Sequence, residues 1–323
     1  MLKLSYFSYK GGSGRTSLVY NTVPFLVEKL GATNKEPIII VDLDVDSAGL
    51  SFLLDNDVIK LKNSNKLTTN ELIDDANLSE MKRLRVESKE NPKPLEDYPI
   101  FKRFTPVGYQ FGLKSEDYNA NNTVLFVPAC PSDDALHFDL SSNTCIKDFL
   151  QFAKNCGVKA VIFDLPAGEQ VSGRQALQYS DIVLVCFRIT KQHRKGTFNY
   201  LERNLINDEK QKYIIVPSAV PDTRKVFYID SGAFNFEAVK ESSIERLEEI
   251  FESKGLNKEQ LITEMFDEEW YGIPEVSRFK FEEGILYNIK KNLPEGKQLM
   301  EDEAKAFEAY DKLSKLITEN IND

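Results

Sequence analysis

A glycine-rich segment near the start of the chain has the residue types that bind phosphate. It lies between an apolar run and a helical pattern, and its sequence is Lys10-Gly11-Gly12-Ser13-Gly14-Arg15-Thr16. Glycines let the backbone approach an anion, so that successive N–H groups and the amino end of a helix point toward it. The spacing predicts a nucleotide site in which Thr16 ligates magnesium and Ser17 contacts the α-phosphate. The alternative is a glycine-rich turn without a ligand.

Carboxylates at the ends of apolar runs could complete such a site. Asp42 ends the run 37–42, and Asp44 and Asp46 follow in alternation, which puts all three on one side of an extended segment. Asp164 ends the run 160–164. A separate calcium site would need a glycine-bearing loop of oxygen ligands, whereas strand, aspartate and loop is the order of a phosphate site. The order therefore favours a phosphate site over a separate metal site, with Asp42 as a candidate ligand of its metal.

Other reactive side chains lack the partners that catalysis requires. Ser8, Thr16 and Ser17 are possible nucleophiles, but neither His137 nor His193 lies in a motif that would make it their base. The cysteines are Cys130, Cys145, Cys156 and Cys186. Because no two form a Cys-x-x-Cys pair, we interpret them as reduced thiols. The sequence has no signal-peptide pattern and no stretch of about eighteen apolar residues, which predicts a cytoplasmic protein without membrane insertion.

Hydrophobic runs and helical patterns alternate along most of the chain. Strands are expected at 2–8, 37–42, 123–128, 160–164, 181–187 and 213–217. Helices are expected at 16–30, in part of 69–86, and at 146–155, 197–207, 237–253 and 298–320. Pro24 should kink the first helix and Gly31 should end it. The alternation predicts an α/β fold with a doubly wound, mostly parallel sheet flanked by helices.

One polar stretch interrupts the alternation. Residues 56–122 contain Pro92, Pro94, Pro99 and Pro106 together with charged runs. We predict that they form an insertion between core strands of a single domain spanning 1–323. Residues 236–323 are predicted to form a helical C-terminal extension. Its last helix has apolar residues at helical spacing and acidic residues on the other face, so it should pack on the core and not on an anionic membrane.

The glycine segment resembles the deviant Walker A motif of the ParA/MinD family of P-loop ATPases, Lys-Gly-Gly-x-Gly-Lys-Thr. It is more similar to a bacterial branch that carries arginine at the second basic position, the KGGVGR-motif variant. In that branch Asp-Leu-Asp followed by Gly-Leu is usual, and this chain has Asp42-Leu43-Asp44 and then Gly49-Leu50. The resemblance covers residues 1–54 and 123–220, is weaker over 271–286, and leaves out the insertion.

The resemblance implies roles for individual residues. Lys10 matches the signature lysine, which reaches across a dimer to the phosphates of the other subunit. Thr16 matches the magnesium ligand, and Asp44 matches the aspartate that positions the attacking water. Asp164, in the Asp-x-Pro-Ala-Gly segment 164–168, matches the Walker B aspartate, which holds magnesium through water. The residues that match the backbone cradle are Gly11, Gly12, Ser13 and Gly14.

Arg15 departs from the family pattern. Lysine is a compact point charge, whereas arginine is planar and forked, although it can bind phosphate through two nitrogens. The resemblance therefore implies a site with Lys10, Asp44 and Arg15 as catalytic candidates, and Arg15 makes hydrolysis the open question. Segments at Pro217 and Pro274 resemble those that flank adenine in the family. The choice of ATP and Mg²⁺ as cofactors comes from the resemblance alone.

The net charge of the chain bears on which molecules it can bind. The net charge of −10 argues against nucleic acid as the main ligand. One basic stretch, Arg188 to Lys195, is either a solvated helix start or a surface for a second subunit or DNA. The resemblance implies a nucleotide-dependent homodimer that acts as a switch for a partner protein, with a role beside an effector in bacterial defence. The alternatives are a non-hydrolysing nucleotide-binding scaffold or sensor and a DNA-partitioning ATPase.

Overall fold

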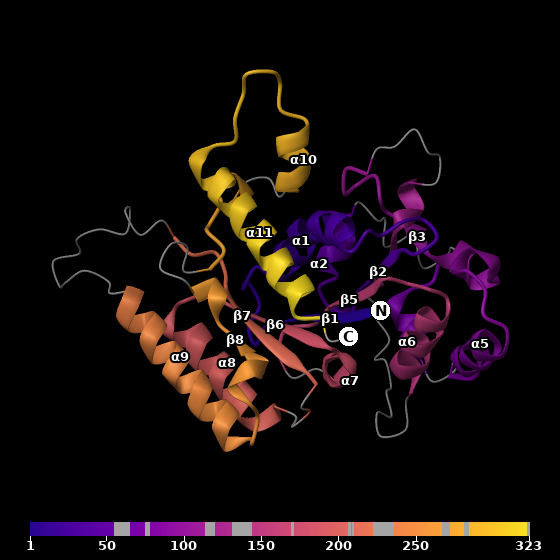
Figure 1. The fold of residues 1–323 in the computed structure, drawn as a ribbon, viewed down its shortest axis with the longest axis horizontal. Helices are drawn as coiled ribbons and strands as arrows, with labels where there is room; N and C mark the ends of the chain where they lie inside the picture. Colours follow the sequence, from indigo (N-terminus) through magenta and orange to yellow (C-terminus); the bar gives the residue numbers. More distant parts are fainter. Residues whose placement is uncertain are drawn as a thin grey trace. The chain divides into compact units, whose positions relative to one another are not determined.

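The computed structural model describes residues 1–54, 65–74, 78–113, 120–130, 144–168, 171–205, 208, 210–221, 236–266, 272–280 and 284–321. Eight strands form one mostly parallel sheet, in the order β3-β4-β2-β5-β1-β6-β7-β8 (Figure 1). The strands are β1 (Leu2–Phe7), β2 (Ile38–Asp42), β3 (Thr105–Pro106), β4 (Val124–Val127), β5 (Ala160–Asp164), β6 (Ile182–Phe187), β7 (Lys212–Pro217) and β8 (Leu261–Ile262). Every residue of β2, β4, β5 and β6 is buried, as expected for parallel strands that helices cover on both faces.

Helices alternate with these strands along the chain. They are α1 (Arg15–Lys29), α2 (Gly49–Leu53), α4 (Thr69–Ile73), α5 (Leu78–Glu90), α6 (Cys145–Asn155), α7 (Val171–Tyr179), α8 (Lys191–Asn204), α9 (Phe236–Ser253), α10 (Leu286–Lys291) and α11 (Glu301–Glu319). Within the described parts of the chain, no helix combines the length and the apolar character that crossing a membrane requires.

The chain packs as two compact units, and it passes from one to the other within β1, within α1 and after Ser180. Unit 1 comprises Met1–Ser5 and Leu26–Ser180. In it, β2 pairs in parallel with β4 and with β5, and Asp42 lies opposite Asp164. β3 runs antiparallel to β4 at the sheet edge, where proline is tolerated because its missing N–H faces no strand. α5 and α6 lie side by side, and Asn155 donates a hydrogen bond to Ser88 over 3.0 Å (Figure 1).

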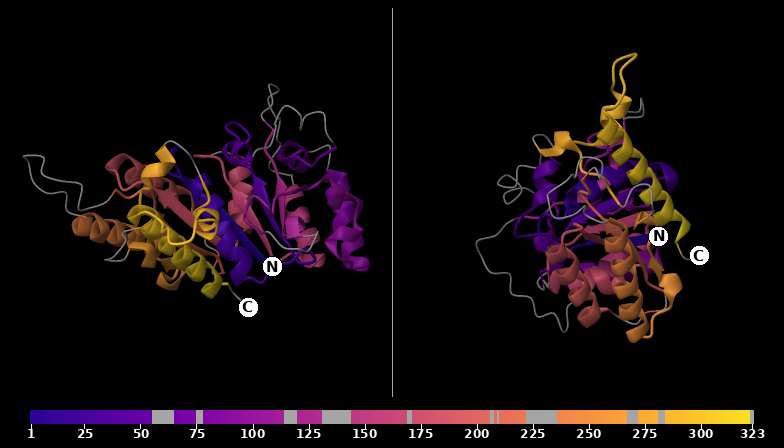
Figure 2. Two further views of the ribbon diagram at one scale, coloured as in Figure 1. Left: turned by 90° about the horizontal axis from the view of Figure 1, so that it is seen from above. Right: turned by 90° about the vertical axis from the view of Figure 1, so that its left-hand side faces the viewer.

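Unit 2 comprises Tyr6–Phe25 and Asp181–Asp323, with β6, β7 and β8 in parallel. One face is covered by α8 and α9, which run side by side (Figures 1 and 2). Phe187 of β6 packs edge-on against Phe198 of α8, and Tyr213 of β7 packs edge-on against Phe251 of α9. These aromatic pairs bury large apolar areas, so the face between strands and helices is a core of this unit.

The helices α1, α10 and α11 form a second cluster in unit 2. Phe25 of α1 makes edge-on contacts with Tyr287 of α10 and Phe307 of α11, at centroid distances of 5.3 and 4.9 Å. The ammonium of Lys290 lies 3.8 Å from the ring centroid of Phe307. The predicted tail helix therefore packs through its apolar face. Glu303 in its acidic first turn is buried as well, where it accepts a hydrogen bond from the backbone N–H at the start of the helix.

The predicted fold class is confirmed, and most element boundaries agree within two residues. The differences concern mostly short or polar segments. The expected helix in 69–86 is two helices, α4 and α5, while α8 begins at Lys191, earlier than predicted, and α11 begins at Glu301, three residues later than predicted. The helices α2, α7 and α10 and the strands β3 and β8 have no counterpart among the predicted ranges. Each missed strand has only two residues, too few to give an alternating pattern. α1 continues through Pro24, and Gly31 follows it with a φ of +59°.

Candidate nucleotide site

The glycine loop connects β1 to α1 within unit 2. Gly12 and Gly14 have φ values of +73° and +75°, in the left-handed region that other residues avoid. These two glycines are therefore needed for the path of the loop. Ser13 between them is buried, whereas Gly11 and Gly12 are exposed.

Three side chains hold carbonyl groups of the loop. The Ser13 hydroxyl donates to the carbonyl oxygen of Lys10. Arg188, the residue after β6, donates from Nε to the carbonyl oxygen of Gly12 over 2.7 Å. Ser218, the residue after β7, donates from its hydroxyl to the carbonyl oxygen of Ser13. The loop is thus fixed from within and from the ends of two neighbouring strands.

This arrangement exposes a set of backbone donors. In a planar trans peptide the C=O and the following N–H point in opposite directions. Holding the three carbonyls therefore turns the N–H groups of Gly11, Ser13 and Gly14 away from the residues that hold them. Within the described residues, no protein group accepts a hydrogen bond from these three N–H groups. Free backbone donors in a glycine loop are typical of sites that bind an anion.

Arg15, the first residue of α1, is only 7% exposed. Its Nη1 donates to the hydroxyl of Ser8 over 3.1 Å. Since Ser8 precedes the loop and Arg15 follows it, this contact ties the two ends of the loop together. Thr16 and Ser17, the residues next along α1, are half-buried in its first turn.

The two predicted adenine-flanking segments lie together in unit 2. Val220 forms a parallel bridge with Pro274. The N–H of Ile273 donates to the carbonyl of Pro217 over 2.8 Å, and the N–H of Glu275 donates to that of Val220 over 2.8 Å. Because Ser218 follows Pro217 and holds the loop, this pair of segments is anchored beside the glycine loop.

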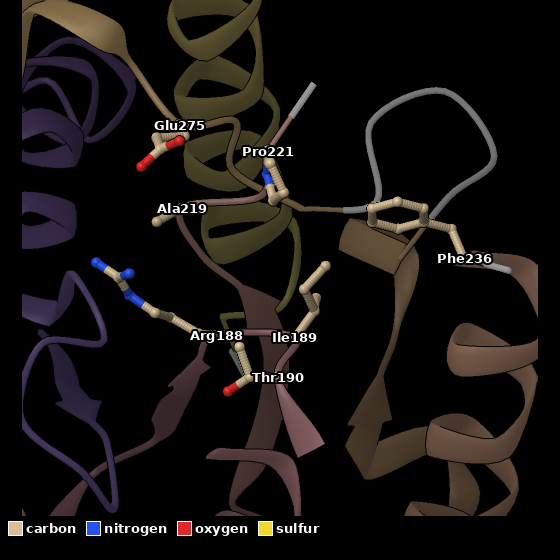
Figure 3. A pocket seen from close by; sticks show the side chains of 7 residues that line it. All are labelled: Arg188, Ile189, Thr190, Ala219, Pro221, Phe236 and Glu275. Atoms are coloured by element: carbon tan, nitrogen blue, oxygen red, sulfur yellow. The ribbon is translucent and has the colours of Figure 1, made fainter. Parts of the chain in front are cut away.

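A cavity of about 290 Å³ opens next to these segments (Figure 3). Its walls come from the ends of β6 and β7, from the Pro274 segment and from the start of α9. The lining residues are Arg188, Ile189, Thr190, Ala219, Pro221, Phe236 and Glu275. Most of these side chains are apolar, while Arg188, Thr190 and Glu275 add a cation, a hydroxyl and a carboxylate. This combination suits a flat heterocycle with polar edges.

The aspartates lie in unit 1, at the carboxyl ends of β2 and β5. Asp42 is fully buried, and Ser51 of α2 donates to it from both its N–H and its hydroxyl, over 3.0 and 2.8 Å. The N–H of Asp44 donates to the other oxygen of Asp42 over 3.1 Å. The Ser51 hydroxyl also accepts a hydrogen bond from the N–H of Ala129, after β4, over 2.9 Å. This network fixes the segment between β2 and α2.

Asp44 has its own place in this segment. It is 8% exposed, and its carboxylate accepts a hydrogen bond from the N–H of Ser47 over 3.2 Å. Its carbonyl accepts from Ala48, which takes the left-handed conformation with a φ of +47° before α2 begins. Asp44 thus organises the turn that leads from β2 to α2.

Burial raises the pKa of Asp42 to about 8, and the charge of the neighbouring Asp164 acts in the same direction. The hydrogen bonds that Ser51 and Asp44 donate to Asp42 lower this pKa, but they do not offset the effect of burial. Two buried carboxylates in opposite positions of adjacent strands repel each other when both are ionised. The pair therefore retains a proton near neutral pH in the absence of a cation.

The pH dependence of stability should report this proton. A carboxyl whose folded pKa lies above its unfolded value binds more protons in the folded state, so its contribution to stability falls as pH rises from about 4 to about 8. Asp42→Asn removes the titration. The unfolding free energy of the wild type, minus that of the variant, should decrease by on the order of 1 kcal/mol per pH unit across this window.

Urea denaturation of both proteins at pH 5, 6, 7 and 8 measures this difference. The amide that Asp42→Asn introduces would face the Ser51 N–H, which adds a constant loss of stability, so only the slope carries the information. A difference that stays constant with pH would contradict a raised pKa.

Several contacts were not predicted from the sequence. Ser218 and Arg188 reach the glycine loop from far along the chain, and their only sequence signal is a polar side chain just past a strand end. Ser51 of α2 bonds to Asp42 nearby and to Ala129 far along the chain. In the basic stretch, Arg194 donates to the carbonyl of Ile189 and to Ser243 of α9. His137 and Tyr271 lie outside the described residues. The cysteines are buried free thiols.

No protein-family model matches the sequence, and comparison with curated proteins gives no significant match. Solved structures do match over nearly the whole of both chains. The ATP complex of an McdA variant from Cyanothece has a TM-score of 0.54 at 16% identity, with 100% of this chain and 98% of that one covered. ParA of pNOB8 bound to nonspecific DNA has a TM-score of 0.53 at 13% identity, with both chains fully covered.

The MinC:MinD cell division complex from Aquifex aeolicus is a third match, with a TM-score of 0.51 at 15% identity over 100% of this chain and 98% of that one. Identities this low establish the fold alone. Together with the parallel sheet and the loop between β1 and α1, they show that this chain has the P-loop ATPase fold of the ParA and MinD proteins.

Proposed function

We propose that this protein is a ParA/MinD-like ATPase that binds ATP and magnesium and acts as a nucleotide-dependent dimeric switch for a partner protein in the cytoplasm. One observation carries the proposal: side chains hold the carbonyls of Lys10, Gly12 and Ser13, and thereby leave three backbone N–H groups free to bind phosphate. A glycine-rich turn without a ligand would have no need of this support from two other strands.

Residue roles follow from the family pattern. The N–H groups of Gly11, Gly12, Ser13 and Gly14 would bind the phosphates, with Ser17 at the α-phosphate. Thr16 and Asp164 would hold magnesium, and Asp42 would act beside Asp164. Magnesium supplies charge neutralisation of the phosphates. Its binding would also displace the proton that the Asp42–Asp164 pair retains, since a cation favours the ionised carboxylates.

The cavity beside Pro217 and Pro274 fits the base of the nucleotide. Its volume of about 290 Å³ and its apolar walls suit a purine, and Glu275 and Thr190 offer hydrogen-bonding groups at its edge. The McdA structure of the same fold contains ATP, which supports ATP as the ligand. The MinD structure contains the partner protein MinC, which supports a protein partner for this chain as well.

Isothermal titration calorimetry of the wild type with Mg–ATP tests the proposal. We expect a micromolar dissociation constant, about −8 kcal/mol. Asp44→Ala should keep most of this affinity and lose ATP turnover, because Asp44 is predicted to position water and not to bind the base. Absence of both heat and a thermal shift with ATP and ADP would refute nucleotide binding. Equal loss of binding and turnover in Asp44→Ala would refute the role of Asp44.

Arg15 supports a second candidate, a nucleotide-binding scaffold that does not hydrolyse ATP. Arg15 is buried and donates a hydrogen bond to Ser8, so it has a structural role at the position where the family has a phosphate-binding lysine. Turnover measured with and without a partner separates the two: a scaffold binds ATP in the calorimeter and releases no phosphate in either assay.

The ParA structure on nonspecific DNA supports a third candidate, DNA binding through the basic stretch. Lys191 and Lys195 are exposed there, although Arg194 is engaged within unit 2. Filter binding of duplex DNA over a salt series tests it, because backbone contacts predict an affinity that falls steeply with salt.

A further inference from the structure

Arg188 lies at the glycine loop although no nucleotide-binding motif includes it. It follows β6, and its Nε holds the Gly12 carbonyl over 2.7 Å. In Figure 3 its guanidinium extends to the side away from Phe236 and Thr190, so the charged end lies at the border of the base cavity and the loop. The side chain is exposed, and within the described residues its two terminal nitrogens have no hydrogen-bond acceptor.

Two further basic groups lie near Arg188. His193, in the first turn of α8, has its pKa lowered by burial first, and then by the charges of Arg188 and Lys10. Its Nδ1 is buried without a hydrogen-bond partner among the described residues. Lys10 and Arg188 therefore both lie close enough to the imidazole of His193 to influence it.

The basic cluster, defined as Lys10, Arg188 and His193, contains two cations without an ion pair to a described carboxylate, although Glu275 lines the same cavity as Arg188. Neither Lys10 nor Arg188 forms an ion pair with a described carboxylate, whereas Arg246 of α9 and Lys305 and Lys315 of α11 each do. Like charges held together without a partner oppose each other, and an anion removes that repulsion. The basic cluster and the free N–H groups would therefore both be stabilised by the same kind of ligand, a polyphosphate.

Arg15 makes the position of Arg188 significant. At the place where an ordinary loop has its phosphate-binding lysine, this chain has a buried arginine that donates to Ser8. Arg188, in contrast, is anchored through Nε and keeps its forked end accessible. Anchoring lowers the entropy lost when the terminal nitrogens bind an oxyanion, and arginine binds phosphate well through two nitrogens.

We propose that Arg188 binds the terminal phosphates of the nucleotide and so supplies a phosphate-facing cation from outside the glycine loop. The inference rests on the proposed function and names a contact within the same site. It predicts a loss that grows with the number of phosphates.

The test compares Arg188→Ala with Arg203→Ala. Arg203 is a matched control because it is also exposed and also donates from Nε to a backbone carbonyl, that of Asn199, at the other end of α8. Calorimetry with Mg–ATP, Mg–ADP, AMP and inorganic tripolyphosphate gives the affinities. Loss of a charge-assisted phosphate contact should weaken ATP and tripolyphosphate binding by about ten- to a hundredfold, ADP less and AMP little, with Arg203→Ala unchanged.

Arg188→Lys should restore part of the affinity, since it keeps the charge but loses the fork. An equal loss for ATP, ADP and AMP would mean that Arg188 only shapes the loop and would overturn the inference. Wild-type affinities in Arg188→Ala would also overturn it and leave the proposed function intact. A wild type that binds tripolyphosphate through Arg188 but not ATP would instead refute the proposed function. Thermal unfolding without ligand shows whether the variant remains folded.

Discussion

Lys10→Ala is expected to abolish ATP-dependent dimerisation and to spare much of the affinity of the monomer for ATP. The lysine side chain is half-buried and makes no ion pair with a described carboxylate, while its carbonyl is held by Ser13. Truncating the side chain therefore leaves the backbone of the loop supported. If the ammonium serves the phosphates of a second subunit, its loss removes a charge-assisted contact only in the dimer.

Size-exclusion chromatography with light scattering, with and without Mg–ATP, measures this effect. Lys297→Ala is the control, because it removes an exposed lysine outside both the loop and the basic stretch. Arg15→Ala should behave differently from both: a buried arginine that ties Ser8 to α1 is lost, so affinity for ATP should fall in the monomer itself. A dimer that still forms with ATP in Lys10→Ala would rule out the contact between subunits.

Gly272→Ala is expected to destabilise unit 2 by at least about 3 kcal/mol. Gly272 has a φ of +122°, which side chains hardly ever adopt. An added Cβ would also collide with the carbonyl oxygen of Pro217 and lie 2.7 Å from its Cβ. That carbonyl accepts the hydrogen bond from Ile273 that joins the two segments beside the cavity, so nucleotide affinity should fall as well.

Gly296→Ala separates backbone strain from collision. Gly296 has a φ of +77°, and a Cβ there would meet no atom within 4 Å. Its replacement should cost only about 1 kcal/mol, the penalty of the left-handed conformation. Urea denaturation followed by circular dichroism compares the two variants. Similar losses for both would show that the Gly272 position can relax away from Pro217.

The long strands of the sheet and the glycine loop could be predicted from the amino-acid sequence alone. Runs such as Ile38–Asp42 and Ile182–Phe187 are apolar at nearly every position because both faces of a parallel strand are buried, and that pattern can be recognised without a structure. The glycines of the loop were equally recognisable, since the positive φ values at Gly12 and Gly14 need residues without a side chain.

The groups that support the loop could be identified only in the folded protein. Ser218 and Arg188 lie about two hundred residues from the loop in sequence, and they reach Ser13 and Gly12 because β6 and β7 end beside it. A single polar residue past a strand end is not part of a periodic pattern. The local sequence therefore cannot distinguish a side chain that holds the loop from one that is solvated.

Arg15 and Gly272 are two further cases in which the fold decided. The motif alone predicts Arg15 at the phosphates, which stays a prediction, and the fold adds Ser8 as a partner. Gly272 resembles an ordinary loop glycine in the sequence, but the fold places Pro217 against it. Local sequence determines backbone conformation and burial, but the partners of a polar group depend on which distant segments the fold brings within hydrogen-bonding distance.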